Sequence, residues 1–263
     1  MKTLITILFF TQSIFAQQIS AVAETFLVAE TFVGIDSYNN IFFIKDRVLN
    51  KVGIRGTFNF NDYQLGRISS VDIINPLKVV AYHEDTNTAV LLDNKLNEIE
   101  RINFNNLPQF INTAFVTNAG NNRLWLFNVD SQQIELFNYR NNTKTIISQP
   151  ITEKVLSVAS NFNYCFVLTE NRLLSYNIFG SVLSEKEVAG FERIFQQDEK
   201  IYAIKKNELF RLPSGAGNDE NKYSEIKKIE LPQLNLMHLY PTQDLLYIYD
   251  GKSIFTFKLT QSN

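Results

Sequence analysis

Cysteine and histidine are almost absent from this chain of 263 residues, which has one cysteine, Cys165, and two histidines, His83 and His238. A single cysteine cannot form an intramolecular disulfide or a cysteine-based metal cluster. Two histidines leave little material for a histidine metal site or for a nucleophile–His–acid triad. We therefore predict a protein that is not an enzyme, with no catalytic residues, no metal and no cofactor.

Neither sign of charge dominates, since 25 Lys and Arg stand against 27 Asp and Glu for a net charge of −2. This balance excludes the basic surface expected of a nucleic-acid-binding protein or of a polybasic membrane anchor. After the N-terminus no apolar run reaches the ~18 residues of a transmembrane helix. Hydrophobic residues make up 45% of the chain, which is enough for one large core or two small ones.

The first residues have the layout of a secretory signal peptide. Lys2 precedes the apolar residues 4–10, and the small Ala16 stands where cleavage is expected. The alternative is an N-terminal core strand or helix. No cysteine stands directly after the apolar run, at the position where a lipoprotein is lipidated, so neither lipidation nor a direct membrane anchor is expected. We predict a signal peptide over residues 1–16 and a single domain over residues 17–263, outside the cytoplasm of a bacterium.

A unit of two apolar strands around a short polar turn recurs six times. The turns are marked by Asp46, Asp85, Asp130, Glu170, Lys206 and Asp250, with a mean spacing of about 41 residues. Short candidates for inner strands precede the units at residues 32–35, 70–74, 113–116, 155–159, 193–195 and 236–239. Alternating, more polar candidates for outer strands follow at residues 96–102, 143–147, 182–188 and 224–229. The period predicts four-stranded propeller blades.

The two chain ends complement each other in this scheme. The last unit stops at residues 258–260 without an outer strand, and residues 21–29 form a strand that has no unit. We therefore predict an all-β fold: a six-bladed β-propeller with four-stranded blades, whose ring is closed by the N-terminal strand completing the last blade. A β-sandwich or two small β domains are the alternatives. With only 10 Gly and 6 Pro, Asn and Asp are expected to form many of the turns.

Few polar residues that could support catalysis fall on the predicted inner strands. They are Asp36, Asp72, Arg193 and His238. Two carboxylates on neighbouring strands could form the acid/base pair of a glycan-active enzyme, but the other blades contribute no matching acid. We expect His238 to be a packed strand residue and His83, beside a hairpin turn, to be solvated.

Several residues outside the predicted strands are candidates for binding a partner, because exposed aromatic side chains with polar neighbours mark protein interfaces. Residues 213–222 interrupt the period and form either a disordered loop or a partner-contacting one. The predicted partner-binding residues are Phe60, Tyr63, Phe110, Asn218, Asp219 and Tyr223.

The N-terminal Met1-Lys2-Thr3, the sequence Phe15-Ala16-Gln17-Gln18, the absence of a lipobox and six short Asn-rich blades resemble a small periplasmic propeller of the Bacteroidota. Among these, size and layout are similar to the plug subunit of the type 9 secretion system outer-membrane translocon, over the whole mature chain. The resemblance implies a non-enzymatic propeller in the periplasm, peripherally associated with an outer-membrane complex. It would bind a large translocon barrel and plug its periplasmic opening. A generic envelope protein-binding propeller, a glycan-active enzyme and a sugar or peptide sensor are the alternatives.

Overall fold

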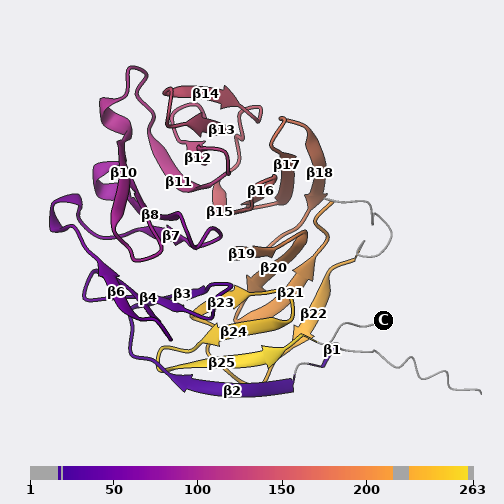
Figure 1. Cartoon of the computed structure of the whole chain (residues 1–263). Helices are drawn as coiled ribbons and strands as arrows, with labels where there is room; N and C mark the ends of the chain where they lie inside the picture. The colour runs from indigo at the N-terminus through magenta and orange to yellow at the C-terminus, as the bar shows by residue number, and fades with distance from the viewer. Residues whose placement is uncertain (1–16, 19, 216–224, 260–263) are drawn as a thin grey trace, which may run out of the picture.

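The computed structural model describes residues 17–18, 20–215 and 225–259, and their strands form six sheets arranged in a ring (Figure 1). Each sheet is a blade of four antiparallel strands, so the predicted all-β, six-bladed propeller is confirmed. The first strand of each blade lies nearest the centre of the ring and the fourth lies at the rim. The predicted signal peptide lies outside the described residues.

Blades 1 to 4 each use four consecutive strands. Blade 1 is β3 (Thr31–Ile35), β4 (Ile41–Lys45), β5 (Val48–Gly53) and β6 (Gly56–Phe60). Blade 2 is β7 (Ser70–Asp72), β8 (Val79–His83), β9 (Thr88–Leu92) and β10 (Glu98–Asn103). Blade 3 is β11 (Thr113–Asn118), β12 (Arg123–Asn128), β13 (Gln133–Asn138) and β14 (Thr143–Ile146). Blade 4 is β15 (Val155–Ser160), β16 (Tyr164–Thr169), β17 (Arg172–Asn177) and β18 (Val182–Glu187).

The last two blades use the N-terminal segment. Blade 5 is β19 (Arg193–Gln197), β20 (Lys200–Lys205), β21 (Glu208–Leu212) and β22 (Lys227–Glu230), with β1 (Gln17–Gln18) added in parallel to β22. Blade 6 is β23 (His238–Pro241), β24 (Leu245–Tyr249) and β25 (Ser253–Lys258), completed by β2 (Ser20–Phe26). Strand β2 runs antiparallel to β25, beside it at the bottom of Figure 1, so the predicted closure of the ring is confirmed.

The hydrophobic core lies between the blades. One cluster joins Phe42 and Leu49 of blade 1 to Val79 and Val90 of blade 2. All five residues of β8 and of β9 are buried, because neighbouring blades cover both faces of the sheet. Cys165 is fully buried in the same way, as expected of a free cysteine, which packs like a small hydrophobic residue. Its burial raises the pKa of the thiol.

Left-handed residues other than glycine make several of the tight turns. Asp46 and Arg47 join β4 to β5 with φ of 53° and 64°, and Lys206 and Asn207 join β20 to β21 with φ of 49° and 62°. Two successive positive φ angles are typical of the two-residue hairpin turn whose twist suits paired strands. Asn and Asp therefore form turns as predicted, with Arg47 and Lys206 in addition. Short 3₁₀ turns, η1 (Tyr63–Leu65), η2 (Glu84–Thr86) and η3 (Phe104–Asn106), lie in other connections.

Three predictions from the sequence are corrected. The segment containing Phe60 was predicted to be loop-like, but Phe60 ends strand β6 and is buried, because β6 pairs with β5 along its whole length. His83 was predicted to be solvated, but it ends β8 with no exposed surface. The innermost strand of blade 6 spans His238–Pro241 and not residues 236–239.

Candidate functional site

Both faces of the ring carry exposed apolar side chains on their loops, and on one face Asx turns hold two aromatic ones in place. We call that face the exit face, because the innermost strands end there; the opposite face, where they begin, is the start face. The exit face consists of the loops 36–40, 54–55, 73–78, 93–97, 119–122, 139–142, 161–163, 178–181, 198–199 and 242–244. Its exposed large apolar residues are Tyr38, Ile54, Leu77, Phe162 and Phe179. Ile54 is 99% and Phe179 89% exposed, so neither side chain contributes to the hydrophobic core.

Side-chain hydrogen bonds within the turns hold these residues in place. The Asp36 carboxylate accepts hydrogen bonds from the backbone N–H groups of Tyr38 and Asn40, both at 2.9 Å. The side-chain oxygen of Asn177 accepts the corresponding bonds from Phe179 at 3.0 Å and Ser181 at 2.9 Å. In both turns the residue two positions after the acceptor is the exposed aromatic. Such Asx turns fix the backbone locally, so the two aromatic side chains project from well-defined positions.

Two more Asx turns lie beside Tyr38. Asp93 accepts hydrogen bonds from the N–H groups of Lys95 at 2.7 Å and Asn97 at 2.9 Å, and the Asn75 side chain accepts one from Leu77 at 3.1 Å. Although partial burial opposes it, the pKa of Asp93 lies below its usual range because of the bonds from Asn97 and Lys95. The Asp93 carboxylate therefore stays ionised and keeps its turn closed over the physiological pH range.

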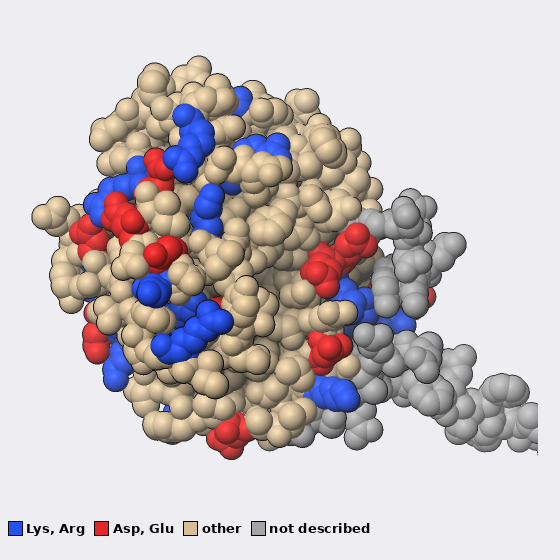
Figure 2. Space-filling view, viewed as in Figure 1, with Lys and Arg blue, Asp and Glu red and all other residues tan. Residues whose placement is uncertain are grey.

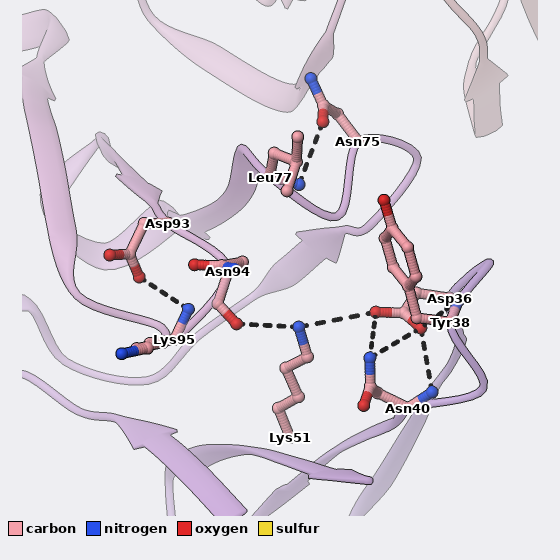
Figure 3. Close-up of polar contacts among 9 residues, drawn as sticks. All are labelled: Asp36, Tyr38, Asn40, Lys51, Asn75, Leu77, Asp93, Asn94 and Lys95. Atoms are coloured by element: carbon pink, nitrogen blue, oxygen red, sulfur yellow. Dashed lines mark hydrogen bonds and ion pairs between the residues drawn. The ribbon is translucent and has the colours of Figure 1, made fainter. Parts of the chain in front are cut away.

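A groove of about 570 Å³ lies between blades 1 and 2, bordered by the turns that Asp36, Asn75 and Asp93 close (Figure 3). Its walls include Tyr38 and Ile54 from blade 1 and Leu77, Asn94 and Lys95 from blade 2. The groove therefore combines apolar, amide and cationic side chains from two blades.

Lys51 ties the two sides of this groove together. Its ammonium group lies 3.6 Å from the Asp36 carboxylate and donates a hydrogen bond of 2.9 Å to the Asn94 carbonyl oxygen. Figure 3 shows the ammonium group between these two loops. The Lys51 side chain is 5% exposed and the Asp36 side chain is fully buried. Because the Asn40 side chain also donates to both Asp36 oxygens, at 3.0 and 2.8 Å, the buried charges are compensated.

Two other cations on the wall of the groove are exposed, and Lys95 is close enough to Asp93 for its charge to help lower the pKa of that carboxyl. Arg55 and Lys95 are exposed, and neither forms an ion pair among the described residues. The Arg55 guanidinium lies 5.9 Å from the centre of the Tyr38 ring. In the view of Figure 2, Lys and Arg gather mainly over the left and upper parts, where Figure 1 shows blades 1 to 3.

A second cavity, of about 500 Å³, lies at the mouth of the central channel on the exit face. Its polar lining includes Asp36, Asn161, Gln197 and Thr242. Next to the lining residues Ile73 and Ile74, burial raises the pKa of Asp72 to about 6, even though the N–H groups of Asn118 and Ile74 donate to its carboxylate.

The candidate catalytic residues form two groups at opposite faces of the ring. Burial and the charges of Asp72 and Asp36 raise the pKa of Tyr240, so the two acids lie around the same side chain. Asp36 and Asp72 lie at the ends of their innermost strands, near the exit face, whereas Arg193 and His238 begin theirs on the start face. Arg193 donates to the carbonyl oxygens of Leu236 and Met237, at 3.2 and 2.9 Å. Burial, together with the Arg193 charge, lowers the pKa of His238. Thus the channel separates the two acids from the two basic groups.

None of the described residues among the predicted partner-binding ones lies on an exit-face loop. Tyr63 and Phe110 are exposed, at 67% and 53%, but both lie on connections between blades at the start face. Phe60 is buried. Asn218, Asp219 and Tyr223 lie outside the described residues.

The aromatic side chains of the exit face were missed by the sequence analysis. The signal was an Asp or Asn followed two positions later by an aromatic residue, as in Asp36-Ser37-Tyr38 and Asn177-Ile178-Phe179. This spacing predicts an Asx turn that displays the aromatic residue.

Comparison with known proteins identifies only the fold. No protein-family model and no curated protein matches the chain. Among solved structures, catalytically inactive virginiamycin B lyase from Staphylococcus aureus with quinupristin is similar at TM-score 0.61 and 9% identity, over 90% of this chain and 99% of that one. The WD40 domain of Neurospora crassa Pan2 is similar at TM-score 0.57 and 7% identity, over 89% and 76%. PorZ, a type-IX secretion component of Porphyromonas gingivalis, aligns at TM-score 0.49 and 16% identity, over 86% of this chain and 31% of PorZ.

Two further observations concern the described residues. None of their helices is long and apolar enough to cross a membrane. In this part of the chain, no three or more His, Cys, Asp or Glu side chains are grouped so that they could hold a metal ion.

Proposed function

We propose that this chain is a non-enzymatic, protein-binding propeller of the bacterial periplasm. Its partner is a large outer-membrane barrel of a protein-secretion system, whose periplasmic opening it blocks. The observation that carries the protein-binding part is the set of exposed apolar side chains held on the exit face by Asx turns. Exposed apolar groups on rigid loops favour association, because burying them costs little conformational entropy.

The closed ring suits a protein that caps an opening. Strand β2 completes blade 6, so the sheet order leaves no gap between the chain ends. Such a ring presents a rigid face without requiring any blade to unfold. The predicted signal peptide and the resemblance to the translocon plug support the periplasmic location and the choice of partner.

Two alternatives use the same fold differently. A generic envelope binder would use the exit face for another partner. A glycan-active enzyme would use the channel, and the raised pKa of Asp72, about 6, is the observation that favours it, because a general acid needs a pKa near the working pH. The carboxylate that would pair with Asp72, that of Asp36, is already bound by Lys51 and Asn40, which counts against that alternative.

A native pull-down tests the proposal. C-terminally tagged protein is recovered from membranes in mild detergent, and its stoichiometric partners are identified by mass spectrometry. The exit-face variant Leu77→Ser/Phe179→Ser is compared with the start-face variant Tyr63→Ser/Phe110→Ser, in which the replaced side chains are similarly exposed. We expect a very large outer-membrane barrel with the wild type and the start-face variant, and its loss with the exit-face variant. Wild-type protein recovered alone would overturn the proposal.

A further inference from the structure

We infer that the groove between blades 1 and 2 binds a partner segment in which an apolar side chain is flanked by Asp or Glu. This inference rests on the proposed function and specifies the chemistry of the contact. It follows from three properties of the groove: walls fixed in advance, an apolar lining and two exposed cations that form no ion pair with the described residues.

The walls are fixed by hydrogen bonds that do not depend on a ligand. Lys51 joins the Asp36 turn of blade 1 to the Asn94 carbonyl of blade 2. Each of the three bordering turns is closed by its own Asp36, Asn75 or Asp93 side chain (Figure 3). A preformed groove loses little entropy on binding. A short extended segment can therefore bind without any rearrangement of the groove walls.

The lining supplies the apolar part of the contact. Tyr38 is 54% and Leu77 58% exposed, and both lie on the walls together with Ile54 and Phe58. An apolar side chain inserted between them would remove exposed hydrophobic surface on both partners. Tyr38 also offers a flat ring of the kind that recurs at the energetic centres of interfaces.

The charges determine which segment fits. The Lys51 charge is already balanced by Asp36 at the base of the groove, whereas Arg55 and Lys95 on its walls have no ion-pair partner among the described residues. A segment carrying Asp or Glu would complement them, and a basic segment would be repelled. Charge complementarity thus favours an acidic segment over a basic one.

The test uses the intact protein and two labelled peptides, Glu-Asp-Phe-Glu-Leu-Asp-Glu and its basic counterpart Lys-Arg-Phe-Lys-Leu-Arg-Lys. Fluorescence anisotropy measures their dissociation constants at low and high salt. We expect the acidic peptide to bind, to weaken as salt screens the charges, and to bind about tenfold or more tightly than the basic one.

Matched variants locate the binding. Arg55→Glu/Lys95→Glu should weaken the acidic peptide about tenfold or more, while Lys154→Glu/Lys186→Glu, an equal charge change at two exposed lysines elsewhere, should change it less than twofold. Tyr38→Ala should weaken binding, whereas Phe179→Ala on blade 4 should not. Circular dichroism confirms that each variant is folded.

Several outcomes would overturn the inference. They are equal binding of the two peptides, no binding at the highest soluble concentration, and an undiminished affinity in Arg55→Glu/Lys95→Glu. Co-sedimentation with phosphatidylglycerol vesicles that this variant abolishes, without peptide binding, would assign the cations to a lipid surface instead.

The two proposals can fail separately. If Arg55→Glu/Lys95→Glu recovers the outer-membrane barrel as well as the wild type does, the groove is wrong and the proposed function stands. If no barrel is recovered but the acidic peptide binds in the groove, the groove stands and the partner is a different protein.

Discussion

Replacing Tyr249 by phenylalanine tests how the ring is closed. Tyr249 is fully buried on β24 of blade 6. Its hydroxyl donates to the Ala29 carbonyl oxygen at 2.8 Å and accepts from the Ala29 N–H at 3.1 Å. Ala29 lies between β2, which completes blade 6, and β3, which begins blade 1. One hydroxyl therefore holds the chain where it passes from the last blade to the first.

The expected loss of stability follows from the groups left unpaired. Phenylalanine keeps the ring and its contact with Phe32, whose centroid lies 6.1 Å away. The two hydrogen bonds to the half-buried Ala29 backbone are lost, together with a longer one of 3.3 Å to the Leu27 carbonyl oxygen. Unsatisfied backbone groups cost about 1–3 kcal/mol when buried, so we expect the variant to lose about 1–2 kcal/mol. For a domain of this size that lowers the Tm by roughly 2–8 °C.

Urea unfolding followed by circular dichroism measures the change. The matched control is Tyr247→Phe on the same strand, because the Tyr247 hydroxyl forms no hydrogen bond with any described residue although the side chain is 8% exposed. We expect the control to change stability by less than about 0.5 kcal/mol. If both variants lost the same amount, or if Tyr249→Phe lost nothing, the assigned role of the hydroxyl would be refuted.

Three other substitutions test the site and the channel. Lys51→Met should lower the free energy of unfolding by about 3 kcal/mol, because it leaves the buried Asp36 carboxylate without its cation; in urea unfolding, the additional change Asp36→Asn should recover part of this loss, and no recovery would contradict the pairing. Gly34→Ala should cost about 1–3 kcal/mol, since a Cβ on Gly34 of blade 1 would collide with the Tyr240 ring of blade 6; a Tm equal to that of the wild type would show that blades 1 and 6 are not in close contact there. The folded-state pKa of Asp72, about 6, exceeds its usual 3.8, so its contribution to stability is complete below about pH 4 and is lost as the pH rises through 6; unfolding at pH 4.5 and pH 7 should show this decrease in the wild type and a smaller one in Asp72→Asn.

The period of the sequence was sufficient to predict the blades, but not every strand. The hairpins were predictable because each has two apolar strands around a turn of two to four mostly polar residues. Strand β6 was not, because it is only five residues long and contains Gly56 and Asn59, which are poor strand formers, although residues 57–60 alternate polar and apolar. It forms a strand because β5 supplies a complete ladder, with Leu49 opposite Phe60. Pairing to a strong neighbour overrode weak local propensity.

The position of His83 shows a related limit. A histidine between an apolar strand and a polar turn is ordinarily solvated, and nothing in the local sequence indicates otherwise. In the structure the whole of β8 is buried, because the second strand of a blade is covered on both faces. The blade was predicted, but the extent of its coverage depends on how closely blade 1 packs against it, for example through Phe60, whose ring lies edge-on to His83 at 6.4 Å.

The candidate site was less predictable than the fold, because it depends on which face each loop occupies. Tyr63 and Phe110 were correctly expected to be hard to bury, and both are exposed. Tyr38 and Phe179 are exposed for a different reason, since each lies two residues after an Asx acceptor. The groove additionally needs Lys51 of blade 1 and Asn94 of blade 2 to meet, which no local pattern could indicate.

The Lys51–Asp36 pair connects the stability of the fold with the shape of the site. A buried ion pair is often no more stabilising than apolar residues of similar volume, so this pair is not required to hold blade 1 together. What apolar residues could not provide is the fixed geometry of the Asp36 turn, which needs a side-chain oxygen that accepts from the N–H groups of Tyr38 and Asn40. The cation that neutralises this carboxylate also binds the Asn94 carbonyl of blade 2. The two walls of the groove are therefore positioned by one charge, and restoring the stability of a Lys51 variant by other means should not by itself restore the shape of the groove.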